Sequence, residues 1–234
     1  RAHPAATMGS NDTTEKLFHI LLTTSHLQKN PNNVVEKVRI PGTYTTVQAA
    51  KAAAYRCLFD AGYEKEWFTT YETKPEIFEN KDLPERSGLA VFAVAPDGTE
   101  FRVHIITTPK DDKLLDEVIE GHVTKPLYYV VQANVEYSAD EGSRVRDIDI
   151  EGVFLTYQEA RDLASRVLLS KENAVTKESF AEYTEAAATE KDCGYGENVV
   201  VRAVSEYGTN YLISVIKNQE LEAVHLAEAA MRIL

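Results

Sequence analysis

Residues 42–58, GTYTTVQAAKAAAYRCL, occur a second time in this chain. The second occurrence is residues 152–168, GVFLTYQEARDLASRVL, which follow 110 residues later without a gap. The two segments are identical at seven positions, whereas average composition would supply about one by chance. The identical pairs are Gly42/Gly152, Thr46/Thr156, Gln48/Gln158, Ala50/Ala160, Ala54/Ala164, Arg56/Arg166 and Leu58/Leu168. The sequence therefore predicts a tandem duplication.

The repeated segment predicts the end of a strand followed by a helix. Apolar residues recur at helical spacing after residue 46, which gives one apolar stripe. The threonines after Tyr44 can cap the first turn with a hydroxyl group, and Gly62 lies where a left-handed C-terminal cap is expected. The alanines at positions 50 and 54 would let this helix lie close to a sheet. We expect a packing role for the helix.

The surrounding residues predict an α+β fold. Strands are expected at residues 17–26, 34–44, 89–95 and 100–108, and helices at residues 64–72 and 111–121. Asp97-Gly98 is typical of a tight turn between two strands, and Tyr207-Gly208 takes its place in the second half. Each unit then reads ββααββα, with antiparallel sheets covered by helices on one face. We expect a first repeat at 16–123 and a second at 124–234, whose last helix is residues 221–234.

The order of elements across the junction is βαββαβ, which is also the order of ferredoxin-like folds. A ferredoxin-like pseudo-dimer is therefore one architecture that the sequence predicts. In that arrangement the first strand of the chain would complete the sheet of the second unit.

Composition narrows the class of protein. The chain has 44% apolar residues and no run long enough for a membrane helix, so a soluble protein is expected. Residues 1–15 are read as a disordered tail or an expression remnant. Cys57 and Cys193 lie in different settings, the first on the predicted helix, so a reducing, cytoplasmic compartment is expected. A reactive thiol at Cys193 is the less favoured interpretation of that residue.

The net charge of −12 is confined to the second half. Residues 1–110 hold 13 basic and 13 acidic residues, and residues 111–234 hold 12 and 24. Phosphate backbones bind to positive charge, so nucleic acid is not an expected partner.

Three residues are candidates for catalysis, although none lies in a diagnostic motif. His19 and His104 fall in apolar strands where the second half has Tyr129 and Ser214. A histidine present in one half alone is what a site built onto one unit would produce. Tyr44 is the third candidate. A histidine in a strand is, however, more often a structural residue than a catalytic one.

Other chemical sites receive little support from the sequence. Nucleophile-elbow, phosphate-loop and dinucleotide fingerprints do not occur. Residues 193–196, CGYG, are a weak phosphate-binding candidate. The carboxylates at 140–151 lack the ligand spacing of a calcium loop and alternate as on a solvated strand. We expect neither a cofactor nor a metal.

Tyrosine is unusually frequent, with 12 residues in the chain. It combines an apolar ring with a polar tip and is common on binding surfaces, but it also favours strands. The predicted binding surface consists of Tyr128, Tyr137, Tyr195 and Tyr207.

Opposite charges occupy matching positions of the second strand of each unit. Lys37 and Arg39 in the first unit correspond to Asp147 and Asp149 in the second. Cross-strand pairs Lys37–Asp149 and Arg39–Asp147 would fix the register if the two strands met about a pseudo-twofold axis. Two independent solvated faces are the alternative.

Two classes of function remain open at this point. The favoured one is a non-enzymatic binding protein, a monomer with pseudo-twofold symmetry or a homodimer, which recognises a protein or a small molecule between its units. The alternative is a small-molecule enzyme of the isomerase, lyase or monooxygenase type with a pocket between helix and sheet.

Overall fold

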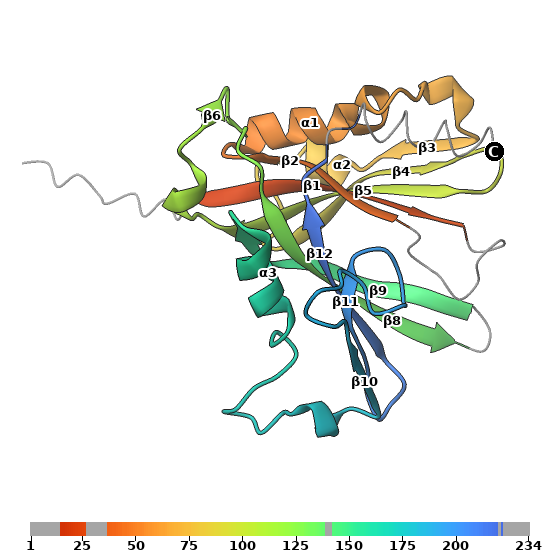
Figure 1. Cartoon of the computed structure of the whole chain (residues 1–234). Helices are drawn as coiled ribbons and strands as arrows, with labels where there is room; N and C mark the ends of the chain where they lie inside the picture. Colours follow the sequence, from red (N-terminus) through yellow and green to blue (C-terminus); the bar gives the residue numbers. More distant parts are fainter. Residues whose placement is uncertain (1–14, 27–36, 139–141, 220, 222–234) are drawn as a thin grey trace, which may run out of the picture.

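The protein is built around two antiparallel β-sheets, one of seven strands and one of five (Figure 1). The computed structural model describes residues 15–26, 37–138, 142–219 and 221. Three α-helices and three short 3₁₀ helices accompany the sheets within this part of the chain.

The order of the first sheet is β3-β4-β5-β1-β2-β7-β6. Its strands are β3 (Thr70–Thr73), β4 (Ser87–Val94), β5 (Glu100–Pro109), β1 (Lys16–Ser25), β2 (Lys37–Tyr44), β7 (His122–Val123) and β6 (Val118–Ile119). The order of the second sheet is β10-β11-β12-β8-β9. Its strands are β10 (Glu182–Glu185), β11 (Val199–Val204), β12 (Asn210–Lys217), β8 (Tyr128–Ser138) and β9 (Gly142–Phe154).

Five strands of each sheet follow one another in a corresponding order, β3-β4-β5-β1-β2 and β10-β11-β12-β8-β9. The pairing registers correspond as well. Phe18 lies opposite Tyr44 in the first sheet, and Tyr128 lies opposite Phe154 in the second. Both of these strand pairs carry an irregularity a few residues before the aromatic residue.

The helix predicted from the repeated segment is confirmed as α1 (Val47–Asp60). The Thr46 hydroxyl accepts a hydrogen bond from the Ala49 amide at 3.2 Å, and Gly62 adopts φ = +95° after the helix. Ala50 and Ala54 are fully buried against the first sheet. The corresponding helix of the second half, α3 (Tyr157–Ala164), begins at the Thr156 cap and is shorter.

Successive side chains of a strand point to opposite faces of the sheet. The buried apolar residues therefore form three separate cores. The outer face of the first sheet packs against α1, and the outer face of the second sheet packs against α3. The inner faces pack against each other, with Leu17, Leu21 and Ile40 on one side and Leu127, Val131 and Ile148 on the other. Through these three cores, α1 packs on the first sheet, the first sheet packs on the second, and the second sheet packs on α3.

The predicted α+β class and its ββααββα unit are wrong, because the protein is mostly β. Residues 64–72 form a 3₁₀ turn, η1 (Lys65–Trp67), and then β3 instead of a helix. Residues 111–121 form a second 3₁₀ turn, η2 (Asp112–Leu114), and then β6. Short segments carry little helical preference of their own, and here pairing with an existing strand satisfies more backbone groups. Two smaller helical elements are α2 (Pro75–Phe78) and η3 (Lys177–Ser179).

The ferredoxin-like pseudo-dimer is wrong for the same reason. The linking helix that the order βαββαβ requires is replaced by η2 and the β6–β7 hairpin. Strand β1 lies between β5 and β2 in the first sheet and does not complete the second sheet.

The structure does not test three further predictions. The division of the chain into units at 16–123 and 124–234 stays a prediction. The predicted tail lies outside the described residues except for Glu15, and the predicted last helix lies outside them except for Leu221. Within the described part of the chain, each helix is too short or too polar to cross a membrane.

Candidate functional site

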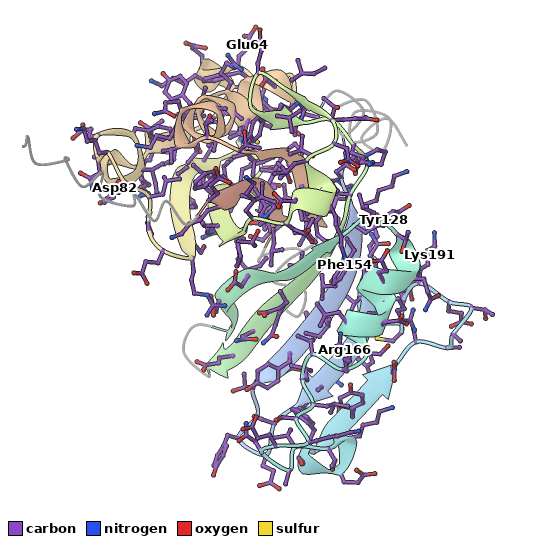
Figure 2. The ribbon with its side chains drawn as sticks, turned by 90° about the vertical axis from the view of Figure 1, so that its left-hand side faces the viewer. Glu64, Asp82, Tyr128, Phe154, Arg166 and Lys191 are labelled. Atoms are coloured by element: carbon purple, nitrogen blue, oxygen red, sulfur yellow. The ribbon has the colours of Figure 1, made fainter. Side chains whose placement is uncertain are left out.

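An open cleft of about 970 Å³ lies where the end of the first sheet faces the edge of the second. One wall comes from Lys16, the segment before β4 and the end of β5 with η2. The other wall comes from β9 and α3. The lining residues on the β9 side are Asp149, Ile150, Glu151, Gly152, Val153 and Phe154, with Leu163 of α3. Figure 2 shows Phe154 at the end of the second sheet that lies nearest the first sheet.

An ion pair between Arg86 and Asp149 crosses this cleft and connects the two sheets. The Arg86 side chain is mostly exposed, whereas the Asp149 side chain is 12% exposed. The other carboxylate oxygen of Asp149 accepts a hydrogen bond from the Ile150 amide at 2.8 Å. Burial raises the pKa of Asp149, and the Ile150 amide and Arg86 oppose that rise. The carboxylate is thus held in place from both walls.

Groups of both charges line the rest of the cleft. Lys110 pairs with Glu15 and lies 3.6 Å from Asp112. Lys16, Lys113 and Glu85 also line the cleft on the side of the first sheet. Glu151 on β9 faces them from the second sheet. The cleft can therefore contact polar groups of either sign.

A buried hydrogen-bonded chain begins at the wall of the cleft and runs between the sheets. The hydroxyl of Thr108, a lining residue, lies 2.7 Å from His19 Nε2. His19 Nδ1 lies 2.8 Å from the Thr43 hydroxyl, and this hydroxyl lies 2.6 Å from the Tyr129 hydroxyl. Burial lowers the pKa of His19 to about 3, so the imidazole is neutral at neutral pH.

The three catalytic candidates do not form one site. His19 points to the inner face of the first sheet with both ring nitrogens hydrogen-bonded. Tyr44 packs on the α1 side, where its ring stacks on His122 at 4.9 Å. His104 lies in β5 opposite Leu21 and Leu89.

His104 has one feature that a structural histidine rarely shows. Its Nδ1 atom is buried without a hydrogen-bond partner among the described residues. Burial, with the charge of Arg102, lowers the pKa of His104 to about 4. The ring is thus neutral at neutral pH and does not line the cleft.

The predicted tyrosine surface is spread over separate elements. Tyr128 at the start of β8 contacts the ring of Tyr157 and the amine of Lys217. Tyr195 lies in a loop under the guanidinium of Arg202 at 4.3 Å. Tyr207 is 97% exposed at the turn before β12. The side chain of Tyr137 lies outside the described part, and a joint binding role for the four stays a prediction.

The predicted pairing between the units also stays a prediction. Strand β2 lies against β12, and β9 lies against β5. Arg39 has Glu197 at 3.8 Å as an ion-pair partner, and Asp149 has Arg86. Lys37 and Arg39 line a narrow pocket of about 40 Å³ with residues of the second sheet.

Sequence reasoning missed Arg86 and Thr108, which both line the cleft. Arg86 stands in a polar loop, where an arginine carries no specific signal. Thr108 lies at the end of a strand, where threonine is common. The cleft is lined by residues of both sheets, which are far apart in the sequence.

The loop at 193–196 and the acidic side chains do not form a binding site for phosphate or metal within the described residues. The loop at 193–196 is closed by a hydrogen bond from the Cys193 amide to the Val199 carbonyl, and burial raises the pKa of the Cys193 thiol. Within the described residues, no group of three or more His, Cys, Asp or Glu side chains is placed to hold a metal ion.

Comparisons with protein-family models, with curated proteins and with solved structures find no match to this chain.

Proposed function

We propose that the protein is a non-enzymatic binding protein whose ligand occupies the cleft between the two sheets. The observation that carries this proposal is the cleft itself, about 970 Å³ in volume and crossed by the Arg86–Asp149 pair. Its volume is in the range of ligand sites in proteins, about 300–1,000 Å³.

The state of the two histidines supports binding over the enzyme alternative. A general base works best when its pKa lies near the operating pH. His19 and His104 have pKa values lowered to about 3 and about 4. His19 also reaches the cleft only through the Thr108 hydroxyl.

The proposal includes the partners and the compartment expected from the sequence. The partner is a protein or a polar small molecule rather than a nucleic acid, since the net charge is −12. Both cysteines are free thiols, Cys57 buried and Cys193 half-buried, which supports a reducing, cytoplasmic compartment. The protein works as a monomer with pseudo-twofold symmetry or as a homodimer.

A thermal-shift screen of the full chain tests the proposal. The probes are amino acids, dicarboxylates, sugar phosphates and short peptides. A ligand present at a hundred times its Kd stabilises the folded state by about 2.7 kcal/mol, which raises the unfolding temperature measurably.

Variants identify the site of any ligand that the screen finds. Glu151→Gln and Lys113→Gln change the cleft, and Lys171→Gln changes an exposed lysine outside the cleft lining. The proposal expects the shift to be lost in the cleft variants and kept in Lys171→Gln. A specific ligand whose shift survives in both cleft variants but is lost in His104→Ala would contradict it and favour the enzyme.

A further inference from the structure

The outer edge of β9 is open to the cleft. β9 is the last strand of the second sheet, and within the described residues it pairs only with β8. Six consecutive residues of this strand, 149–154, line the cleft. An unpaired strand edge offers backbone N–H and C=O groups to an incoming strand.

The matching edge in the first sheet is already covered. The Thr45 amide, just after β2, donates to the Gly121 carbonyl at 2.8 Å, and Tyr44 lies opposite His122 of β7. Farther along β2, the Ile40 carbonyl accepts a hydrogen bond from the Gln219 amide at 3.2 Å. The chain thus uses its own residues to complete this edge.

Within the part of the chain that the structure describes, the corresponding groups of the β9 edge have no such cover. Leu155 corresponds to Thr45, and its amide has no partner among the described residues. The Ile150 amide, earlier on β9, donates to the Asp149 carboxylate. The open part of the edge is therefore its end, at the Leu155 amide beside Phe154.

The side chains at the two edges are presented in the same way. A Cβ added at Gly42 would lie 2.9 Å from the Tyr44 ring, and one added at Gly152 would lie 2.8 Å from the Phe154 ring. Each aromatic ring thus folds back over a glycine two residues earlier. On the covered edge His122 stacks on Tyr44 at 4.9 Å, and Val123 beside it is buried between the sheets.

We propose that an extended segment of a partner protein adds to the outer edge of β9 inside the cleft. The segment would place an aromatic or imidazole ring against Phe154 and a β-branched residue next to it, as His122 and Val123 do on β2. Main-chain hydrogen bonds give affinity in strand addition, and alternate side chains give specificity. This inference rests on the proposed binding function and names the ligand of the same cleft.

The experiment uses the ¹⁵N-labelled full chain and a synthetic peptide with the sequence of residues 116–125, DEVIEGHVTK. This peptide contains the segment that covers β2. A peptide with the substitution V123P is the control, because proline removes a donor from the strand. With the native peptide alone, we expect saturable chemical-shift changes of residues 153–155 and slowed hydrogen exchange of the Leu155 amide.

Two protein variants test the position of the peptide. Phe154→Leu keeps an apolar side chain but removes the ring, and it should weaken peptide binding by about three- to tenfold. Tyr207→Ala removes a fully exposed ring of the same sheet and should leave binding unchanged. Equal affinity in Phe154→Leu and the unmodified chain would overturn the proposed position of the ring.

Three outcomes would overturn the inference. The native peptide causes no saturable shift at millimolar concentration, it shifts residues away from β9, or the Leu155 amide is already protected in the free chain. Protection in the free chain would mean that another part of this chain or a second copy occupies the edge. A small molecule that binds to the cleft while the peptide does not would leave the binding function intact and remove only the peptide as its ligand.

Discussion

The hydroxyl groups of Thr43 and Tyr129 lie 2.6 Å apart, and their hydrogen bond connects the first sheet to the second. Both residues are 1% exposed. The Thr43 hydroxyl also contacts His19, so the bond is part of the chain that ends at the cleft wall.

The first prediction concerns this bond. Tyr129→Phe leaves the buried Thr43 hydroxyl with one partner fewer, and we expect the free energy of unfolding to fall by about 1–3 kcal/mol. Urea unfolding at neutral pH measures it. Tyr207→Phe, at a position 97% exposed, should change stability by less than about 0.5 kcal/mol. Equal effects of the two substitutions would show that the hydrogen bond between the sheets contributes nothing to the free energy of unfolding.

The second prediction is a loss of stability in mild acid. His19 and His104 take up protons near pH 6.5 when unfolded but only near pH 3 and pH 4 when folded. Between these values the unfolded state holds more protons, so the free energy of unfolding decreases as the pH falls below about 6.5. Each histidine contributes up to about 1.4 kcal/mol per pH unit in its window.

Nuclear magnetic resonance of the histidine rings checks the cause directly. The ring carbons of His19 and His104 should not titrate between pH 7 and pH 5, because the folded pKa values are about 3 and about 4. A midpoint near 6.5 for either ring would contradict the prediction for that residue.

The third prediction concerns the ion pair across the cleft. Arg86→Ala removes the cation that opposes the rise of the Asp149 pKa. The pKa of Asp149 should therefore rise further, and the free energy of unfolding at neutral pH should fall by about 1 kcal/mol. Only the ionised Asp149 carboxylate is stabilised by Arg86. The loss of unfolding free energy in Arg86→Ala should therefore become smaller as the pH falls through the pKa of Asp149.

Carboxyl carbon resonances measure the pKa of Asp149, and urea unfolding measures the stability. Arg56→Ala is the matched control, since Arg56 pairs with Asp60 at 3.9 Å on the exposed side of α1. That pair should contribute no more than about 0.5 kcal/mol. A cost of Arg86→Ala no larger than that of Arg56→Ala would contradict the prediction.

The fourth prediction tests why glycine stands before the repeated helix. An alanine Cβ at position 42 would lie 2.9 Å from the Tyr44 ring, closer than such atoms normally approach. Gly42→Ala should therefore cost about 1–3 kcal/mol. In a Tyr44→Ala background the same change should be nearly neutral. A double-mutant cycle with no coupling between the two positions would rule out this explanation.

The repeated segment predicted α1 correctly because the information is local. Thr46 supplies the cap, Ala50 and Ala54 supply the buried stripe, and Gly62 supplies the left-handed end. The Asp97-Gly98 turn is confirmed for the same reason. Gly98 adopts φ = +90°, and the Asp97 carboxylate accepts a hydrogen bond from the Thr99 amide at 3.0 Å.

The fold class was wrong where local preference is weak and pairing decides. A helix is predicted at residues 64–72, but Phe68 precedes β3 and Tyr71 pairs with Ala93 across β3 and β4. The two rings still pack together, at 5.6 Å, through the strand rather than through a helix. Glu120 and Gly121 adopt positive φ values and turn the predicted helix at 111–121 into a hairpin.

The candidate site was harder to predict than the fold. His19 is a candidate because the second half has Tyr129 at the matching position, and the structure joins the two residues through the Thr43 hydroxyl. That contact links two sheets, and no sequence spacing encodes it. Arg86 meets Asp149 only because the edge of β9 faces the end of the first sheet.

The inner face of the first sheet also sets a condition on how the chain is synthesised. Translation delivers Leu17, Leu21 and Ile40 long before Leu127 and Ile148, which cover them. A nascent chain that ends before residue 127 therefore carries a bare apolar face, of the kind that aggregates or recruits chaperones. The first sheet is made first, but it is protected only when the second sheet leaves the ribosome.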